Sequence, residues 1–191
     1  MFLKLVEKTR TIRRFDRSKL ITDTDLMSFL ECSRKSASAG NLQRIRFVTV
    51  SGSEAEKAFS NVSLGGLLPP DKKPTQSVAP TAYIVLCSKE ENPDANLLID
   101  VGITAQTIAL SAAEKGVGAC MIRNFSKEYF SSLMSEEFPF PILVIALGYP
   151  SEIARTVDVS TNDSLKYYKN ESGENIVPKL TLSELVIKKY D

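Results

Sequence analysis

The sequence predicts a single α+β or α/β domain with one mixed sheet of four or five strands over residues 1–191. Apolar, β-branched runs alternate with segments of helical periodicity, so the strands are separated by helices. One predicted helix near the middle of the chain is apolar over much of its circumference, which makes it either the centre of the domain or a subunit interface. No internal repeat, low-complexity segment or linker divides the chain.

The helices are predicted from periodicity and capping residues. Thr22 and Asp25 form a capping box ahead of a helix that runs to about Arg34. The other helices are expected around Phe2, Leu5 and Val6, over 54–60 after the cap Ser53, over 96–115, from the cap Ser126 to about 134, and after a second capping box at 181–184.

The strands are predicted from short apolar runs between turn residues. They are expected over 46–50, 83–87, 119–122 and 142–147, the last of them ended by Gly148-Tyr149-Pro150. A loop of small residues lies at 36–41. A longer loop at about 65–80 is either a lid or binding loop, or disordered.

Composition excludes several classes of function. Lys plus Arg number 24 against 23 Asp plus Glu, so we expect no general attraction to nucleic acid or to an anionic membrane. We expect no signal peptide and no membrane span, since the N-terminus is charged and the apolar run at 141–147 is too short. Cys32, Cys87 and Cys120 match neither a redox motif nor zinc spacing. They predict reduced, mostly buried thiols in a cytoplasmic protein.

The chain contains no histidine. This excludes a Ser-His-Asp or Cys-His catalytic pair, an H-E-x-x-H zinc site and a histidine general base. A protein that does chemistry without histidine often takes its reactivity from a cofactor. We therefore expect neither a catalytic side chain nor a metal.

Two short segments could bind an anionic or planar ligand. Arg10, Thr11 and Arg13 offer two guanidinium groups and a hydroxyl within four residues, which suits a phosphate. The segment 38–43 combines small residues with amide side chains, so a flat ligand can approach its backbone. Taken alone, the first is also compatible with a solvated basic turn and the second with an ordinary polar loop.

Two further segments concern glycines and a turn. Gly116-Val117-Gly118 follows a helix and lacks the third glycine of a dinucleotide fingerprint, so we reject a Rossmann site. The turn Ile122-Arg123-Asn124-Phe125 enters a capped helix, where backbone N–H groups suit an electron-rich atom. Taken alone, the pattern favours a plain strand-to-helix turn.

Together and in order, these segments resemble the nitroreductase family of FMN-dependent NAD(P)H oxidoreductases. The resemblance covers most of the chain. It lies in Arg10-Thr11-Ile12-Arg13-Arg14-Phe15, in 36–47 with its Ser-Ala-Gly-Asn-Leu-Gln core, in Asp100 to Gln106 with Gly116-Val117-Gly118, in the strand ending at Gly148-Tyr149-Pro150, and in Val177-Pro178-Lys179. It implies an α+β fold with a mainly antiparallel sheet. It also implies a homodimer that holds FMN at its interface, with the long central helix in that interface.

The resemblance implies a role for each basic residue. Arg10 and Thr11 would hold the phosphate and ribityl groups of FMN. Arg13 would face the N1/O2 edge, where a cation favours the anionic reduced flavin. Arg155, after the Gly-Tyr-Pro stop, is either a second phosphate cation or a surface charge.

The remaining contacts implied by the resemblance come from the loop and the turn. The loop would contribute Ser38, Ala39, Asn41 and Gln43 from the other subunit. The turn of Ile122, Arg123 and Asn124 would present a backbone N–H to flavin N5, the atom that accepts hydride.

The reaction implied is ping-pong hydride transfer from NADH or NADPH through flavin N5 to a small electron-poor acceptor, such as a nitroaromatic or a quinone. The alternatives are reductive dehalogenation, flavin breakdown, or a dimer that binds flavin without catalysis. Arg44-Ile45 replaces the family's usual Pro-Trp, and Arg123-Asn124 occupies a position where many relatives carry glycine or an acidic residue. These departures leave the acceptor open, and no motif indicates the nicotinamide preference.

Overall fold

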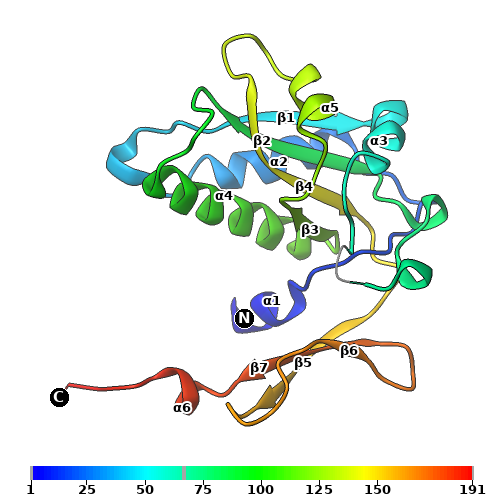
Figure 1. Cartoon of the computed structure of the whole chain (residues 1–191), viewed down its shortest axis with the longest axis vertical. Coiled ribbons are helices and arrows are strands. Elements are labelled where there is room, and N and C mark those ends of the chain that lie inside the picture. The colour runs from blue at the N-terminus through cyan, green and yellow to red at the C-terminus, as the bar shows by residue number, and fades with distance from the viewer. Residues whose placement is uncertain (1, 66–67, 191) are drawn as a thin grey trace.

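The computed structural model describes residues 2–65 and 68–190, which form the predicted α+β fold (Figure 1). Its helices are α1 (Phe2–Lys8), α2 (Asp23–Ser33), α3 (Gly52–Phe59), α4 (Ala95–Glu114), α5 (Lys127–Ser132) and α6 (Leu182–Leu185), with 3-10 turns η1 (Ala39–Asn41), η2 (Pro70–Lys72) and η3 (Gln76–Val78). Its strands are β1 (Arg46–Ser51), β2 (Ala82–Ser88), β3 (Gly118–Ile122), β4 (Phe140–Gly148), β5 (Ala154–Val159), β6 (Tyr168–Lys169) and β7 (Asn175–Leu180).

The main sheet has the strand order β1-β2-β4-β3, and each neighbouring pair is antiparallel. Its central strand β2 is buried at every position. Because side chains alternate along a strand, Ile84 and Leu86 face one side of the sheet and Tyr83 and Val85 the other. Burial on both faces explains why β2 is a continuous apolar run.

Helices cover both faces of this sheet (Figure 1). On one face, Phe29 of α2 and Ile108 of α4 pack against Ile84 and Ile145 in one core cluster. On the other face, Phe130 of α5 and the small residues of α3 form a second cluster. Each fully buried large apolar side chain contributes about 1.5–3 kcal/mol to folding, so the two clusters hold the strand ends where the candidate site residues lie.

Helix α4 buries nine of its 20 residues on the sheet and on α2. Its Leu98, Ile99 and Ile103 remain exposed. Within the described residues, α4 is the one helix long and apolar enough, by length and composition, to cross a membrane. The packing of its buried face is that of the core helix of a domain.

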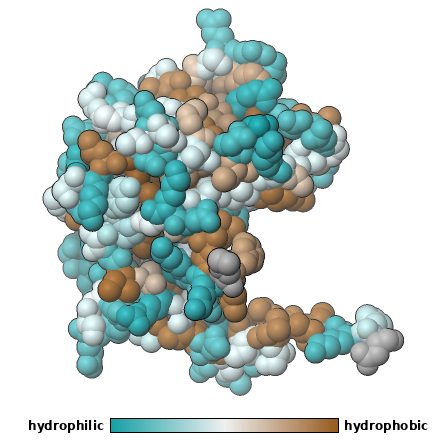
Figure 2. All heavy atoms as spheres, turned by 180° about the vertical axis from the view of Figure 1, so that it is seen from behind, coloured by the Kyte–Doolittle hydropathy of each residue, from teal (hydrophilic) through white to brown (hydrophobic). Residues whose placement is uncertain are grey.

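A second, three-stranded sheet follows the main one and was not predicted. Strand β7 pairs with β5 in parallel and with β6 in antiparallel orientation. The chain then continues through α6 into an arm that stands away from the body (Figures 1 and 2). Leu182, Leu185 and Ile187 are exposed on this arm.

Most predicted elements are confirmed, and two capping predictions are wrong. The Thr22–Asp25 box and the Ser126 cap both form. Ser53 does not cap α3, because β1 continues to Ser51 and the helix starts at Gly52. The box at Thr181 does not form either, since α6 is a four-residue turn and the Thr181 hydroxyl pairs with that of Ser183.

The predicted long loop contains η2 and η3, and its Gly66 and Leu67 lie outside the described residues. All three cysteines are free thiols, with Cys87 and Cys120 buried and Cys32 exposed.

Candidate functional site

The segment 10–15 runs alongside β3 at the edge of the main sheet. Thr11 forms an isolated parallel bridge with Ala119, and the Ile12 N–H donates to the Ala119 carbonyl at 3.0 Å. Ile12 and Phe15 turn inward and are buried. This register fixes the positions of Arg10, Thr11 and Arg13.

A glutamate after β4 fixes the same segment from the other side. Both Arg13 and Arg14 donate their backbone N–H groups to Glu152 Oε1, at 2.6 and 3.1 Å. The other oxygen of Glu152 accepts from Asn175 Nδ2 of β7 at 2.8 Å. One carboxylate therefore joins the N-terminal segment to the small sheet.

Between these two parts lies a cavity of about 280 Å³, which we call the cationic cavity. It is lined by Thr9, Arg10, Thr11, Arg13, Gln106, Tyr167, Asn175, Val177 and Lys179. Three of these residues are cations and none is a carboxylate. The arrangement suits a ligand with an anionic group.

Arg10 has spare donor capacity in this cavity. One of its terminal nitrogens donates to the Val6 carbonyl at 2.6 Å. Its Nε is buried and has no partner among the described residues. The Arg13 guanidinium lies over the Tyr167 ring, 5.2 Å from its centroid, so an aromatic side chain borders the cations.

The sequence does not predict Gln106, Tyr167 or Lys179 as ligand contacts, although all three line this cavity. Val177-Pro178-Lys179 carries the family resemblance only as an ending before the last helix. The alternation of β7 could have indicated more, because Asn175, Val177 and Lys179 share one face of a strand.

Arg155 is not brought to the cationic cavity. It is paired in register with Ile176, so alternation directs it to the opposite face of the small sheet from Asn175, Val177 and Lys179. Its guanidinium forms an ion pair with Glu174 at 2.8 Å and is largely exposed.

The loop that carries Ser38, Ala39, Asn41 and Gln43 has an unusual backbone. Gly40, Asn41 and Gln43 have φ values of 56°, 53° and 48°. Left-handed backbone at non-glycine residues is uncommon and costs free energy, so it is often associated with functional sites. Asn41 and Gln43 are exposed, and Gln43 Nε2 donates to Asn41 Oδ1 at 3.2 Å.

Ser38 and Gln43 border a separate cavity of about 230 Å³ beneath this loop, which we call the loop cavity. Its floor includes Ser33 of α2 and Asp100 and Thr104 of α4, all buried. Arg44, one of the departures from the family pattern, also lines it and makes two hydrogen bonds to the Asp94 carboxylate at 2.8 and 3.0 Å. These bonds and the Leu97 N–H lower the pKa of Asp94, the cap of α4, to about 2.

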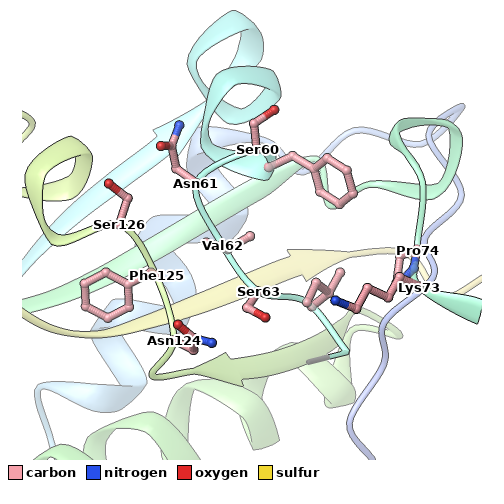
Figure 3. A pocket seen from close by; sticks show the side chains of 11 residues that line it. Ser60, Asn61, Val62, Ser63, Lys73, Pro74, Asn124, Phe125 and Ser126 are labelled. Carbon is pink, nitrogen blue, oxygen red and sulfur yellow. The ribbon is translucent and has the colours of Figure 1, made fainter. Parts of the chain in front are cut away.

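The turn after β3 borders a third cavity of about 410 Å³, which we call the turn cavity (Figure 3). Ile122 is buried and pairs with Val144, whereas Arg123 and Asn124 are exposed. The Ser63 N–H donates to the Asn124 carbonyl at 2.8 Å, which joins the turn to the segment 59–64. Lys73 supplies the cation in the lining of this cavity, with Phe59 and Phe125 as aromatic members.

The three predicted groups thus lie around three cavities that share no lining residue in one chain. No cluster of three or more potential metal ligands was found in the described ranges 2–65 and 68–190. A strained polar loop, an exposed strand-to-helix turn and a cationic cavity define an α+β protein equipped to bind an anionic ligand.

The sequence comparison identifies the family. The model of the Nitroreductase family matches residues 6–149, so the chain belongs to the Nitroreductase family. No curated protein matches the sequence significantly.

Similar solved structures share the fold at low sequence identity. A nitroreductase family protein from Streptococcus pneumoniae TIGR4 is 18% identical, with a TM-score of 0.66 over 87% of this chain and 96% of that one. An FMN-dependent nitroreductase from Clostridium difficile R20291 is 19% identical, with a TM-score of 0.63 over 85% and 99%. A nitroreductase-type protein from Desulfovibrio desulfuricans, solved in complex with FMN, is 16% identical, with a TM-score of 0.67 over 99% and 96%.

Proposed function

We propose that this protein is an FMN-dependent oxidoreductase that passes hydride from NADH or NADPH to a small electron-poor acceptor, such as a nitroaromatic or a quinone. The observation that carries the proposal is the cationic cavity with Arg10, Arg13 and Lys179 in its lining, in a chain of the Nitroreductase family. Two of the similar structures support the choice of FMN, one as an FMN complex and one named FMN-dependent.

The residues of the cationic cavity fit the phosphate end of FMN. Its phosphate carries up to two negative charges, and the cavity offers Arg10, Lys179 and the Thr11 hydroxyl in addition to Arg13. Arg10 Nε, buried and without a partner in residues 2–65 and 68–190, is a donor that a phosphate oxygen would satisfy. Glu152 binds Arg13 through its backbone only, so the guanidinium over the Tyr167 ring would face the flavin edge.

Bound FMN would supply the two-electron carrier for ping-pong transfer, taking hydride at N5 from the nicotinamide and passing it to the acceptor. The chain's own task is to bind and orient. Arg13 stabilises negative charge at the flavin edge. The turn at Asn124 borders the turn cavity, which we assign to the acceptor because its aromatic members suit a planar ring and Lys73 suits an anionic substituent.

We also propose that the active unit is a homodimer. In one chain the loop residues Ser38 and Gln43 lie around a different cavity from Arg10 and Arg13, which supports a dimer in which the second copy brings its loop to the cofactor. The exposed Ile99 and Ile103 of α4 and the apolar arm after α6 offer surface for such a contact. Light scattering should give the mass of two chains, and a monomer that binds FMN fully would contradict this part.

The main proposal is tested by purifying the protein and titrating it with FMN. We expect a yellow protein whose flavin absorbance is bleached by NADH or NADPH without oxygen and restored by a nitroaromatic or quinone. A protein that gains no flavin absorbance with excess FMN would refute the cofactor. Bound FMN that neither nicotinamide bleaches would favour a non-catalytic flavin-binding dimer.

A further inference from the structure

The loop 36–43 needs an external support to keep its conformation. Gly40, Asn41 and Gln43 all have left-handed backbone within four residues. Such conformations persist only where the surroundings over-determine them. The hydrogen bonds within the loop, such as the one from Gln43 N–H to Ser38 Oγ at 3.3 Å, hold it together but do not fix it to the domain.

Two hydrogen bonds fix the loop to helix α4. The Ala39 N–H donates to Asp100 Oδ1 at 2.9 Å, and the Ser36 hydroxyl donates to Thr107 Oγ1 at 2.9 Å. The first bond reaches the strained part of the loop directly. Asp100 is 3% exposed, so its carboxylate has little freedom to move.

The rest of the Asp100 environment shows that hydrophobic packing alone does not explain this residue. Its second oxygen, Oδ2, is buried without a partner among the described residues, as are Ser33 Oγ and Arg44 Nε in the same cavity. A buried carboxylate with one unsatisfied oxygen is costly. The other oxygen, Oδ1, accepts the hydrogen bond from the Ala39 N–H, and this contact accounts for a carboxylate at the position.

We propose that Asp100 is a positioning residue for the cofactor: through the Ala39 N–H it sets the loop conformation that presents Ser38, Asn41 and Gln43 to FMN. This inference rests on the proposed FMN function. Asp100 does not touch the cofactor itself. Ile99 and Ile103, near Asp100 on α4, are among the exposed apolar residues of that helix. The loop is therefore aligned to the same helix that faces the second subunit in the proposed dimer.

The test removes the hydrogen bond from each side. Asp100→Ala deletes the acceptor, and Ala39→Pro deletes the donor. Proline is compatible with this position because Ala39 opens η1 and the preceding Ser38 is extended, with φ −138° and ψ 152°. FMN affinity is measured by the quenching of flavin fluorescence. Each variant should weaken it about 10-fold or more, as expected for loss of a hydrogen bond to a charged group.

The double variant and two further variants test whether the loss of FMN affinity comes from the Asp100–Ala39 hydrogen bond. Asp100→Ala with Ala39→Pro should be no weaker than the poorer single variant, because both remove the same contact. Asp100→Asn keeps an acceptor oxygen and should restore most of the affinity. Ser33→Ala removes another buried polar group from the same cavity, one without a hydrogen-bond partner in the described part of the chain, and should leave FMN affinity unchanged.

Hydrogen exchange of the FMN-free protein separates this inference from the proposed function. Asp100→Ala should speed exchange at the amides of Asn41, Leu42 and Gln43, and Ser33→Ala should not. If the wild-type protein binds no FMN, the proposed function fails while this measurement still tests the anchor. Unchanged exchange in Asp100→Ala, wild-type FMN affinity in that variant, or a loss in Asp100→Asn as large as in Asp100→Ala would overturn the inference.

Discussion

Gly118 and Gly148 are register partners across β3 and β4, and each leaves space for a side chain of the N-terminal segment. A Cβ on Gly118 would lie 2.7 Å from Ile12 Cγ1, and one on Gly148 would lie 2.7 Å from Phe15 Cδ1. Neither glycine has a positive φ. Both are therefore required for close approach and not for backbone conformation. The two missing side chains form a notch that accepts Ile12 and Phe15, and this packing places Arg10 and Arg13 at the cationic cavity.

The first prediction concerns this notch. Gly118→Ala should destabilise the protein by about 1–3 kcal/mol, because Ile12 has to move out of a packed core. Chemical denaturation measures the loss. Gly102→Ala is the matched control, since among the described residues its Cβ would meet nothing within 4 Å and alanine is the better helix former. Because Gly102 is exposed on α4 next to Ile103, light scattering checks that this variant keeps the oligomeric state of the wild type. Equal stability of the two variants would contradict the packing role of Gly118.

The second prediction concerns Lys179, a residue of the cationic cavity that the sequence did not indicate. Lys179→Gln should weaken FMN binding about 10-fold, as expected for one charge-assisted contact. Arg155→Gln should leave the affinity unchanged, because Arg155 pairs with Glu174 on the other face of the small sheet. Fluorescence titration compares both variants with wild type. A loss confined to Arg155→Gln would return the phosphate role to that residue.

The third prediction concerns the acceptor. Lys73→Gln should raise the KM for the anionic acceptor 4-nitrobenzoate about 3-fold and leave the KM for the neutral acceptor nitrobenzene unchanged. The effect is small because an ion pair with an exposed cation contributes less than about 1 kcal/mol to binding. Lys72→Gln is the control, because Lys72 is a neighbouring exposed cation that does not line the turn cavity. The effect should shrink in high salt. Parallel changes for both acceptors would remove the turn cavity from the acceptor site.

The fourth prediction concerns pH. The pKa of Asp94 is lowered to about 2, first by its hydrogen bonds to Arg44 and then by the Leu97 N–H. A lowered pKa means that the contribution of Asp94 to stability is complete above its ordinary value near 3.8 and is lost as the pH falls through about 2. Carboxyl NMR titration should show the pKa moving upward in Arg44→Gln. An unmoved pKa would show that Arg44 is not its main partner.

The sequence predicted the main sheet well because its two central strands, β2 and β4, are largely buried on both faces. β2 and β4 are continuous apolar runs between turn residues, and short runs of this kind are typical of buried strands. Helix α4 was equally clear from its apolar circumference. The small sheet was missed for the opposite reason. β5 is half exposed, β6 has two residues, and β7 contains Pro178, which argues against a strand.

The site was predictable only where a residue type signalled its own chemistry. The cations at 10 and 13 and the amides at 41 and 43 did so. Lys179 did not, because its role depends on a parallel pairing of β5 and β7 across a long connection. Asp100 begins one of the segments that carry the family resemblance, but the sequence did not indicate its role, since its contact with the Ala39 backbone joins positions 61 residues apart.

The cationic cavity joins residues 9–13 to residues 167–179, with Glu152 joining the two parts. During synthesis, residues 9–13 of the cavity leave the ribosome before residues 167–179. The cavity closes only after Lys179 has emerged and β7 has paired with β5. In the proposed FMN enzyme, cofactor loading would therefore follow the pairing of β7 with β5, and a product that ends before β7 would lack Asn175, Val177 and Lys179 of the cavity lining.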